Sequence, residues 1–357
     1  MKYNGLVTLT QTAVLTRHFI LIFSISLIVG IVSFIGYKLW LSYYLANLPP
    51  VEEKPDTRFG LLPEPDFPKA LVSSSNFSYS LDTSTGSLPE VGVEAGFEKI
   101  IKVYFVIKPY ASLLSSEKSA SLAQNFAMTD SPEIINETLY RFKKDEKTLT
   151  VNLDSGNFNY INEATVSTKE SLDDDNKLIS DFKNTMQKLG VFRDEFQNGR
   201  TKITLLKIAG NELVPTPLRT EAVAAQVSIW PQNIDKKSIF TPDFNTALIR
   251  AIVLKGADTL ENYLSLELTH WPIDTTTFAT YPTKSAEDAF ADLRSGKGVV
   301  VLEPVKAEVS ITSIYLGYYL AENYSPYLQP IYVFEGPQFI AYVSAIADQF
   351  KSSAIQN

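Results

Sequence analysis

The pattern of apolar and polar positions changes character along the chain, and its first part is apolar on every side. Phe19 to Tyr37 is a run of nineteen residues without a charge. A helix needs roughly 20 apolar residues to cross the hydrocarbon core of a bilayer. After Lys38 the sequence continues apolar and aromatic as far as Leu45. We therefore predict a transmembrane helix over residues 19–45, in contact with the lipid bilayer, behind a short tail over residues 1–18.

Two other interpretations of this apolar run fit less well. A cleaved signal peptide has an apolar core of roughly 7–15 residues and a small-residue cleavage site, whereas this run is longer and lacks such a site. A buried core helix is rarely apolar all round over this length. Arg17 and the shortness of the preceding tail favour a cytoplasmic N-terminus, because positive charge tends to stay inside. The rest of the chain is then extracytoplasmic.

Proline and hydroxyl residues dominate the next stretch. Seven prolines lie between residues 46 and 96, and residues 73–87 are rich in Ser and Thr. Proline stiffens and extends a linker. We therefore predict that residues 46–96 form a stalk between the membrane and the folded part, with Phe77–Leu81 as a candidate edge strand.

After the stalk, the pattern alternates between helical and strand periodicity. Residues 97–260 contain about two units in which a helix is followed by antiparallel strands, and residues 261–350 form a third. Ser285 to Asp288 resembles a capping box, with Asp in the usual place of Glu or Gln. The fold class predicted is α+β, an N-terminal transmembrane helix followed by repeated helix-plus-antiparallel-sheet units. The expected helices are 116–128, 172–189 and 286–294, and the expected strands include 102–107, 138–142, 148–153, 203–208, 225–230, 248–254, 328–334 and 339–346.

Composition excludes several classes of function. The net charge is -8, and because residues 1–18 carry two positive charges and no acid, the remainder carries -10. Phosphate groups repel such a body, so no nucleic-acid partner is expected. The chain has no cysteine, which excludes disulfides, thiolate nucleophiles and Cys-ligated metal sites.

No group of residues matches a catalytic or metal-binding motif. The chain has two histidines, His18 and His270, and lacks HExxH, Walker A, GxGxxG and GxSxG patterns. His270, near Glu267, is interpreted as a residue at a strand end. Asp173–Asp175 lacks the spacing of a calcium loop and is interpreted as acids that offset the positive end of a helix dipole. We therefore expect no catalytic residue, cofactor or metal, and no enzymatic activity.

The tyrosine-rich stretch near the C-terminus is the candidate partner-binding surface. Tyrosine is enriched at protein interfaces, so these side chains could form an aromatic recognition face. The alternative, favoured by general burial statistics, is that they alternate between the core and the surface of one meander. The candidates are Tyr315, Tyr318, Tyr319, Tyr327 and Tyr332.

The C-terminal unit also resembles a known family. The run Thr280–Phe290, with Gly296 and Gly298 behind it, is similar to the helix start of PepSY-like and YycH/YycI-like extracytoplasmic domains. Tyr315–Tyr319 and Tyr327–Phe334 resemble paired strands at the end of those domains, as does Phe339–Ile346. The resemblance is best over residues 261–347, and over residues 97–260 it lies in the order of elements only.

The resemblance implies a membrane-anchored protein with an exported α+β body. Its relatives are accessory proteins that bind and restrain membrane partners such as sensor kinases, or modules attached to peptidases. We therefore expect a single-pass cell-membrane protein that regulates an envelope protein by binding it, with strand addition at a sheet edge as one mode. Two alternatives stay open: an envelope enzyme or its inhibitory module, and a structural subunit of a membrane assembly. The long stalk and the missing peptidase motif depart from the family.

Overall fold

The computed structural model describes residues 9–46, 54–163 and 171–352. The chain divides into two compact units, residues 1–54 and residues 55–357. We call the second unit the body, and each unit is described by itself.

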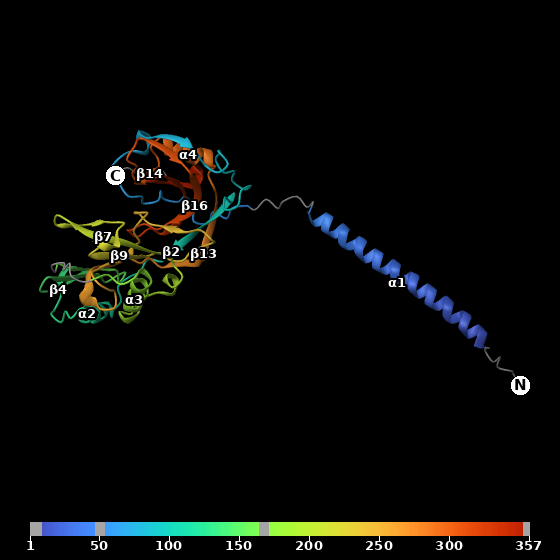
Figure 1. The fold of residues 1–357 in the computed structure, drawn as a ribbon, viewed down its shortest axis with the longest axis horizontal. Helices are drawn as coiled ribbons and strands as arrows, with labels where there is room; N and C mark the ends of the chain where they lie inside the picture. The colour runs from blue at the N-terminus through green and yellow to red at the C-terminus, as the bar shows by residue number, and fades with distance from the viewer. Residues whose placement is uncertain (1–8, 47–53, 164–170, 353–357) are drawn as a thin grey trace. The chain divides into compact units, whose positions relative to one another are not determined.

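The first unit contains one long helix, α1 (Leu9–Ala46) (Figure 1). Within it, Ala13–Tyr44 is long and apolar enough to cross a membrane, and none of its most apolar stretch is buried inside the protein. The predicted transmembrane segment, residues 19–45, lies inside α1. Of the predicted tail, residues 9–18 are helical, and residues 1–8 lie outside the described residues.

The body contains a nine-stranded antiparallel sheet built from two halves. Each half is a helix followed by antiparallel strands, and the last strands of the halves, β6 and β12, pair with each other. This pairing removes an unpaired edge from each half, and such edges are liable to aggregate. In spatial order the strands are β3 (Glu133–Asn136), β4 (Leu139–Lys144), β5 (Lys147–Asn152), β6 (Phe158–Asn162), β12 (Tyr263–Leu268), β11 (Ile249–Val253), β9 (Ala224–Ile229), β7 (Thr201–Ala209) and β8 (Glu212–Pro215).

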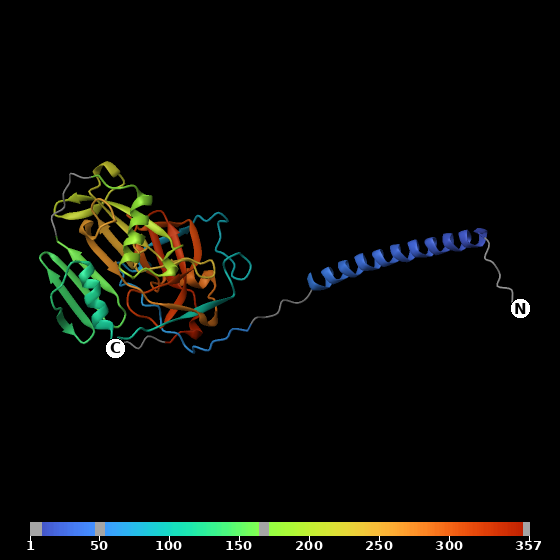
Figure 2. The same cartoon turned by 90° about the horizontal axis from the view of Figure 1, so that it is seen from below.

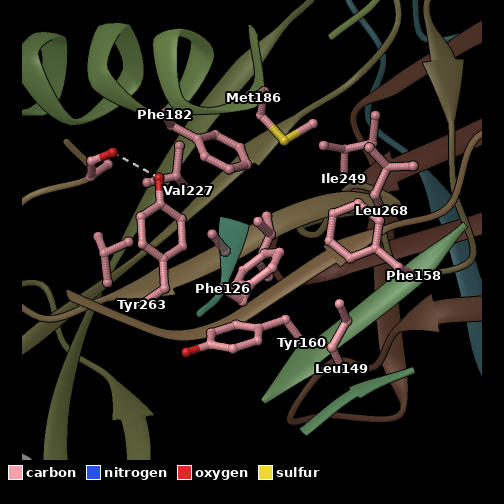
Figure 3. Close-up of a cluster of buried hydrophobic side chains, with 14 of the residues drawn as sticks. Phe126, Leu149, Phe158, Tyr160, Phe182, Met186, Val227, Ile249, Tyr263 and Leu268 are labelled. Atoms are coloured by element: carbon pink, nitrogen blue, oxygen red, sulfur yellow. Dashed lines mark hydrogen bonds between the residues drawn. The ribbon is translucent and has the colours of Figure 1, made fainter. Parts of the chain in front are cut away.

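Two helices cover one face of this sheet, α2 (Ser115–Asn125) and α3 (Asp175–Lys188). In the view from below they lie in front of its strands (Figure 2). Phe182 and Met186 of α3 and Phe126, just after α2, meet inward side chains of the strands in one buried cluster (Figure 3). The predicted helices are confirmed in place. Gly190, with φ 72°, follows the C-cap of α3 and supplies the left-handed backbone with which many helices end.

The second sheet has seven strands and joins distant parts of the sequence. The antiparallel meander of β16, β17 and β18 was predicted and is confirmed. The path runs β10 (Ile239–Phe240), β16 (Ser313–Tyr319), β17 (Tyr327–Gly336), β18 (Phe339–Ser344) and β14 (Val299–Leu302), while β2 (Ile100–Val106) pairs with β17 and with β13 (Ile273–Pro282).

Helix α4 (Ala286–Arg294) packs against β18. The N-cap half of its predicted capping box is confirmed, because Ser285 Oγ accepts the Asp288 backbone N–H at 3.0 Å. The Asp288 carboxylate accepts from the Ser285 hydroxyl at 2.7 Å. A parallel pair, β1 (Ser78–Leu81) and β15 (Glu308–Ile311), confirms the candidate edge strand of the predicted stalk.

The predicted boundary between residues 97–260 and residues 261–350 does not separate the two sheets. Strands β2 and β10, from the first region, belong to the seven-stranded sheet, and β12, from the second, belongs to the nine-stranded sheet. The body is one compact unit. The chain therefore crosses between the two sheets several times. Sequence periodicity predicts where strands form, but it does not identify which strands pair with each other.

The prediction of a stalk over residues 46–96 is wrong for residues 55–96, which pack into the body. Leu62 is fully buried, and Phe59 and Phe77 lie against the core of the seven-stranded sheet. The prolines of this stretch suggested a stiff linker between the membrane and the folded part. The missing N–H of proline also suits a segment that lies across a protein surface without joining a β-ladder. We call residues 55–68 the strap.

Candidate binding groove

A groove of about 850 Å3 lies in the part of the body that carries the nine-stranded sheet. One wall is α2. The others are residues 152–156 between β5 and β6, residues 189–193 after α3, and the end of β12 with His270. The groove therefore draws on both halves of the sheet, although they are far apart in sequence.

The turn at residues 152–156 is fixed by its own side chains. Asn152 Oδ1 accepts the backbone N–H groups of Asp154 and Ser155, each at 3.0 Å. Gly156, with φ 73°, supplies the left-handed backbone that closes the turn. Asp154 Oδ1 accepts the Ala111 N–H at 2.8 Å. The turn thus holds the loop that leads into α2.

That loop exposes four large apolar side chains within eight residues. We call Ile107, Tyr110, Leu113 and Leu114 the apolar rim; their exposed fractions are 44, 71, 101 and 55 %. Tyr110 and Leu114 line the groove itself. Single exposed apolar residues are ordinary, whereas a gathering of them beside a hollow is typical of an interaction site.

Helix α2 begins beside the rim without a side-chain cap. The helix starts at Ser115, one residue before the predicted start at residue 116, and its N-cap position is Leu114, which makes no capping bond. A leucine at the cap forgoes about 1 kcal/mol that Ser or Asp would provide, so local helix stability does not explain Leu114.

Charged side chains of both signs face the groove. Lys118 and Glu117 come from α2 and Arg193 comes from the segment after α3. Within residues 54–163 and 171–352 none of the three takes part in a salt bridge. Such charges keep their capacity to pair with groups of a bound molecule.

His270 lies between the groove and the core, with 15 % of its side chain exposed. Its Nε2 is 2.5 Å from Glu195 Oε1, and its backbone N–H donates to Asn157 Oδ1 at 2.9 Å. Glu267, the neighbour suggested by the sequence, instead forms an ion pair with Arg250. Sequence reasoning missed Glu195 because it lies 75 residues away from His270 and no local pattern links them.

The structure does not support the predicted tyrosine face. Tyr318 and Tyr332 are fully buried and Tyr319 is 3 % exposed, while Tyr315 and Tyr327 are half-buried. The expectation that they alternate between core and surface also fails, because both faces of this meander are covered. The strap supplies part of that cover, with Phe59 stacked on Tyr327.

The hydroxyls of these tyrosines bind groups inside the body. Tyr332 donates to the Lys284 carbonyl at 2.7 Å, Tyr319 to the Asp66 carbonyl at 2.9 Å, and Tyr315 to Glu335 Oε2 at 2.8 Å. Burial raises the pKa of all three phenols above their usual range. They remain neutral donors that hold the core together.

The acidic cluster has the role that the sequence predicted, at the start of a helix. Asp174 is the N-cap of α3 and accepts the Lys177 N–H at 3.1 Å. Asp173 pairs with the Lys177 side chain at 2.6 Å, and Asp175 pairs with Arg219. Among the residues that the structure describes, no group of three or more His, Asp or Glu side chains could hold a metal ion.

Comparison with known proteins adds no identity. No family model matches the chain and no curated protein matches it. One similar solved structure is that of an uncharacterized protein from Eubacterium rectale. It is 11 % identical, with a TM-score of 0.33, and the match covers 78 % of this chain and 91 % of that one. A likeness this weak carries no argument on fold or function.

Proposed function

We propose that this chain is a single-pass membrane protein whose extracytoplasmic body binds and regulates an envelope protein. The N-terminus is cytoplasmic in this proposal. The resemblance of residues 261–347 to PepSY-like and YycH/YycI-like domains supports an accessory role of this kind. The chain acts by recognition, without catalysis of its own.

The apolar rim beside the groove is the observation that carries the proposal. Leu113 is wholly exposed and Tyr110 is 71 % exposed, so covering them would remove apolar area from water at about 25 cal/mol per Å2. A small ligand sits inside a concave site, so it would leave the rim residues outside the groove uncovered. They suit a protein surface that covers the rim and inserts a side chain into the groove.

A photo-crosslinking amino acid at position 113 in living cells tests this proposal. The matched control is position 305, because Val305 is 88 % exposed in the chain between β14 and β15. We expect position 113 to crosslink to one envelope protein and position 305 to give no defined product. Leu113→Asp should lower recovery of that protein by at least about tenfold, since a buried unpaired charge is costly. Equal crosslinking from both positions, or none from position 113, would contradict the proposal.

A second candidate function rests on His270 and Glu195. A histidine held by a carboxylate beside a groove is an arrangement found in general acid–base sites, so the body could be an envelope hydrolase. This candidate predicts that the purified body hydrolyses envelope peptides or glycans and that His270→Gln abolishes the activity. Under the binding proposal, the purified body has no hydrolytic activity, either with His270 or with His270→Gln.

A further inference from the structure

The strap lies on the body in the manner of a bound peptide. Phe59, Leu62 and Pro65 repeat every three residues and are half-buried, fully buried and buried, whereas Leu61 and Glu64 between them are exposed. The Gly60 N–H donates to the Thr57 carbonyl at 2.9 Å, and Gly60 has φ 71°, so the strap turns once after Phe59. Its prolines then continue across the surface, as in segments that proline-recognising grooves bind.

Aromatic side chains of the seven-stranded sheet contact two aromatic residues of the strap, Phe59 and Phe67. Phe59 stacks on Tyr327 with ring centres 4.9 Å apart, and Phe67 meets Tyr319 edge-on at 4.9 Å. Leu62 lies between them in sequence and is part of the buried core. Aromatic seats for apolar anchors are typical of grooves that bind proline-containing segments.

Side-chain donors of the body hold the strap by its backbone carbonyls. Tyr281 Oη donates to the Gly60 carbonyl at 2.9 Å, and Gln329 Nε2 donates to the Pro63 carbonyl at 2.8 Å. Tyr319 Oη donates to the Asp66 carbonyl at 2.9 Å. Carbonyls are the backbone groups that proline leaves available. These three bonds go to backbone carbonyls, so they do not depend on the side chains of the strap.

The C-terminal segment completes the seat. The Leu62 N–H donates to the Phe350 carbonyl and the Ser352 N–H donates to the Leu62 carbonyl, both at 2.8 Å. Lys351 Nζ pairs with Glu64 at 3.1 Å. Both the seven-stranded sheet and residues 350–352 therefore bind the strap.

We propose that this seat is a binding site for proline-containing segments, and that the chain occupies it in cis with residues 59–68. The competing ligand is a segment of a partner protein with an aromatic residue, a leucine and a proline at three-residue spacing. Because the strap follows the membrane helix after residues 47–54, displacing it lengthens the tether of the body. This inference does not depend on the groove, which is lined by other residues.

A cleavage experiment tests the proposal on the full-length protein. The recognition sequence of a specific protease replaces residues 69–72, where Lys69 and Ala70 are exposed and Leu71 is 93 % exposed. The protein is placed in phosphatidylcholine vesicles and cleaved. A tethered segment competes at an effective concentration on the order of 1 mM, and cleavage removes that advantage.

We expect the cleaved body to stay on the vesicles through the strap. A synthetic peptide of residues 55–68 should then release it, at a concentration at least about tenfold below that of the same peptide carrying Leu62→Asp. Uncleaved protein with peptide is the control, and near-ultraviolet circular dichroism checks that the released body stays folded.

Three results would overturn the proposal. Immediate loss of the body on cleavage, before peptide is added, would show that the seat has too little affinity. Retention that neither peptide reverses would show that the strap is a fixed part of the core. Equal release by the two peptides would show that Leu62 does not determine binding.

Discussion

The two sheets of the body differ in how many of their faces are covered. In the nine-stranded sheet, β6 alternates between buried and exposed residues, as expected when helices cover one face. In the seven-stranded sheet every residue of β18 is buried, because α4 and the strap lie among the elements that cover it. A strand buried on both faces does not alternate between apolar and polar residues. Its sequence therefore does not show whether its tyrosines are buried or form a binding surface.

The largest effect should come from substitutions at adjacent positions. Val333 and Phe334 are both fully buried, in clusters on opposite faces of β17. We expect Phe334→Ala to cost about 3–5 kcal/mol and Val333→Ala about 2 kcal/mol of unfolding free energy. On β6, Tyr160→Ala should be similarly costly, but Asn159→Ala should stay within about 0.5 kcal/mol.

Urea unfolding of the body measures all four variants. A near-neutral result at either Val333 or Phe334 would mean that one face of the seven-stranded sheet is open, and the contrast between the sheets would fail.

The strap gives the next largest effect. Leu62 is fully buried and Leu61 is 60 % exposed. We expect Leu62→Ala to lower the unfolding free energy by about 2–4 kcal/mol, whereas Leu61→Ala should change it by less than about 0.5 kcal/mol. The same urea titration compares them. Two equal and small changes would restore the interpretation of this stretch as a stalk.

An ionic clip at the C-terminus predicts a pH dependence. Asp348 accepts hydrogen bonds from Lys284 and Lys351, at 2.7 and 2.8 Å, and these bonds lower the pKa of its carboxyl to about 2. An unfolded Asp titrates near about 3.9. The stabilisation is therefore complete above about pH 4 and is lost as pH falls from there towards about 2.

Because Asp348 is 61 % exposed, solvent screening limits this effect to about 1 kcal/mol. Urea midpoints at about pH 5 and about pH 2.5 measure it. Asp348→Asn should reduce the drop between the two pH values. A drop of the same size in the variant would assign the acid sensitivity to other carboxylates.

The smallest expected effect on stability is at the apolar rim. Leu113 is wholly exposed, so Leu113→Asp should change the unfolding free energy by less than about 0.5 kcal/mol, while it lowers recovery of the partner by at least about tenfold. Leu122, in the helix α2 that follows the rim and 8 % exposed, is the contrast. Leu122→Ala should cost about 2–4 kcal/mol. A large loss of stability at Leu113 would mean that the rim is structural.

Local elements were predictable because their signals lie within a few residues. The N-cap at Ser285, the helix α3 and the strands β4 and β5 all appear where the sequence places them. Partners across long distances were not. The contact of His270 with Glu195 and the pairing of β2 with β13 have no local signature.

The sequence predicted the candidate site only in part. A tyrosine-rich stretch has the same sequence pattern whether its side chains are buried or exposed. The strap that helps to bury these tyrosines lies some 250 residues earlier in the chain, with Phe67 against Tyr319. The apolar rim could have been noticed as Leu113 and Leu114 in a loop. Its exposure depends on what packs nearby.

The sequence by itself determined the long apolar helix near the N-terminus, the α+β class of the body and most helix and strand positions. Periodicity, caps and turn residues act over a few residues, so a sequence displays them directly. Tertiary structure decided which strands share a sheet, that the strap covers the tyrosines, and that the groove and rim lie at the surface. These outcomes depend on contacts between distant segments, whose free energies compete only when the whole body has folded.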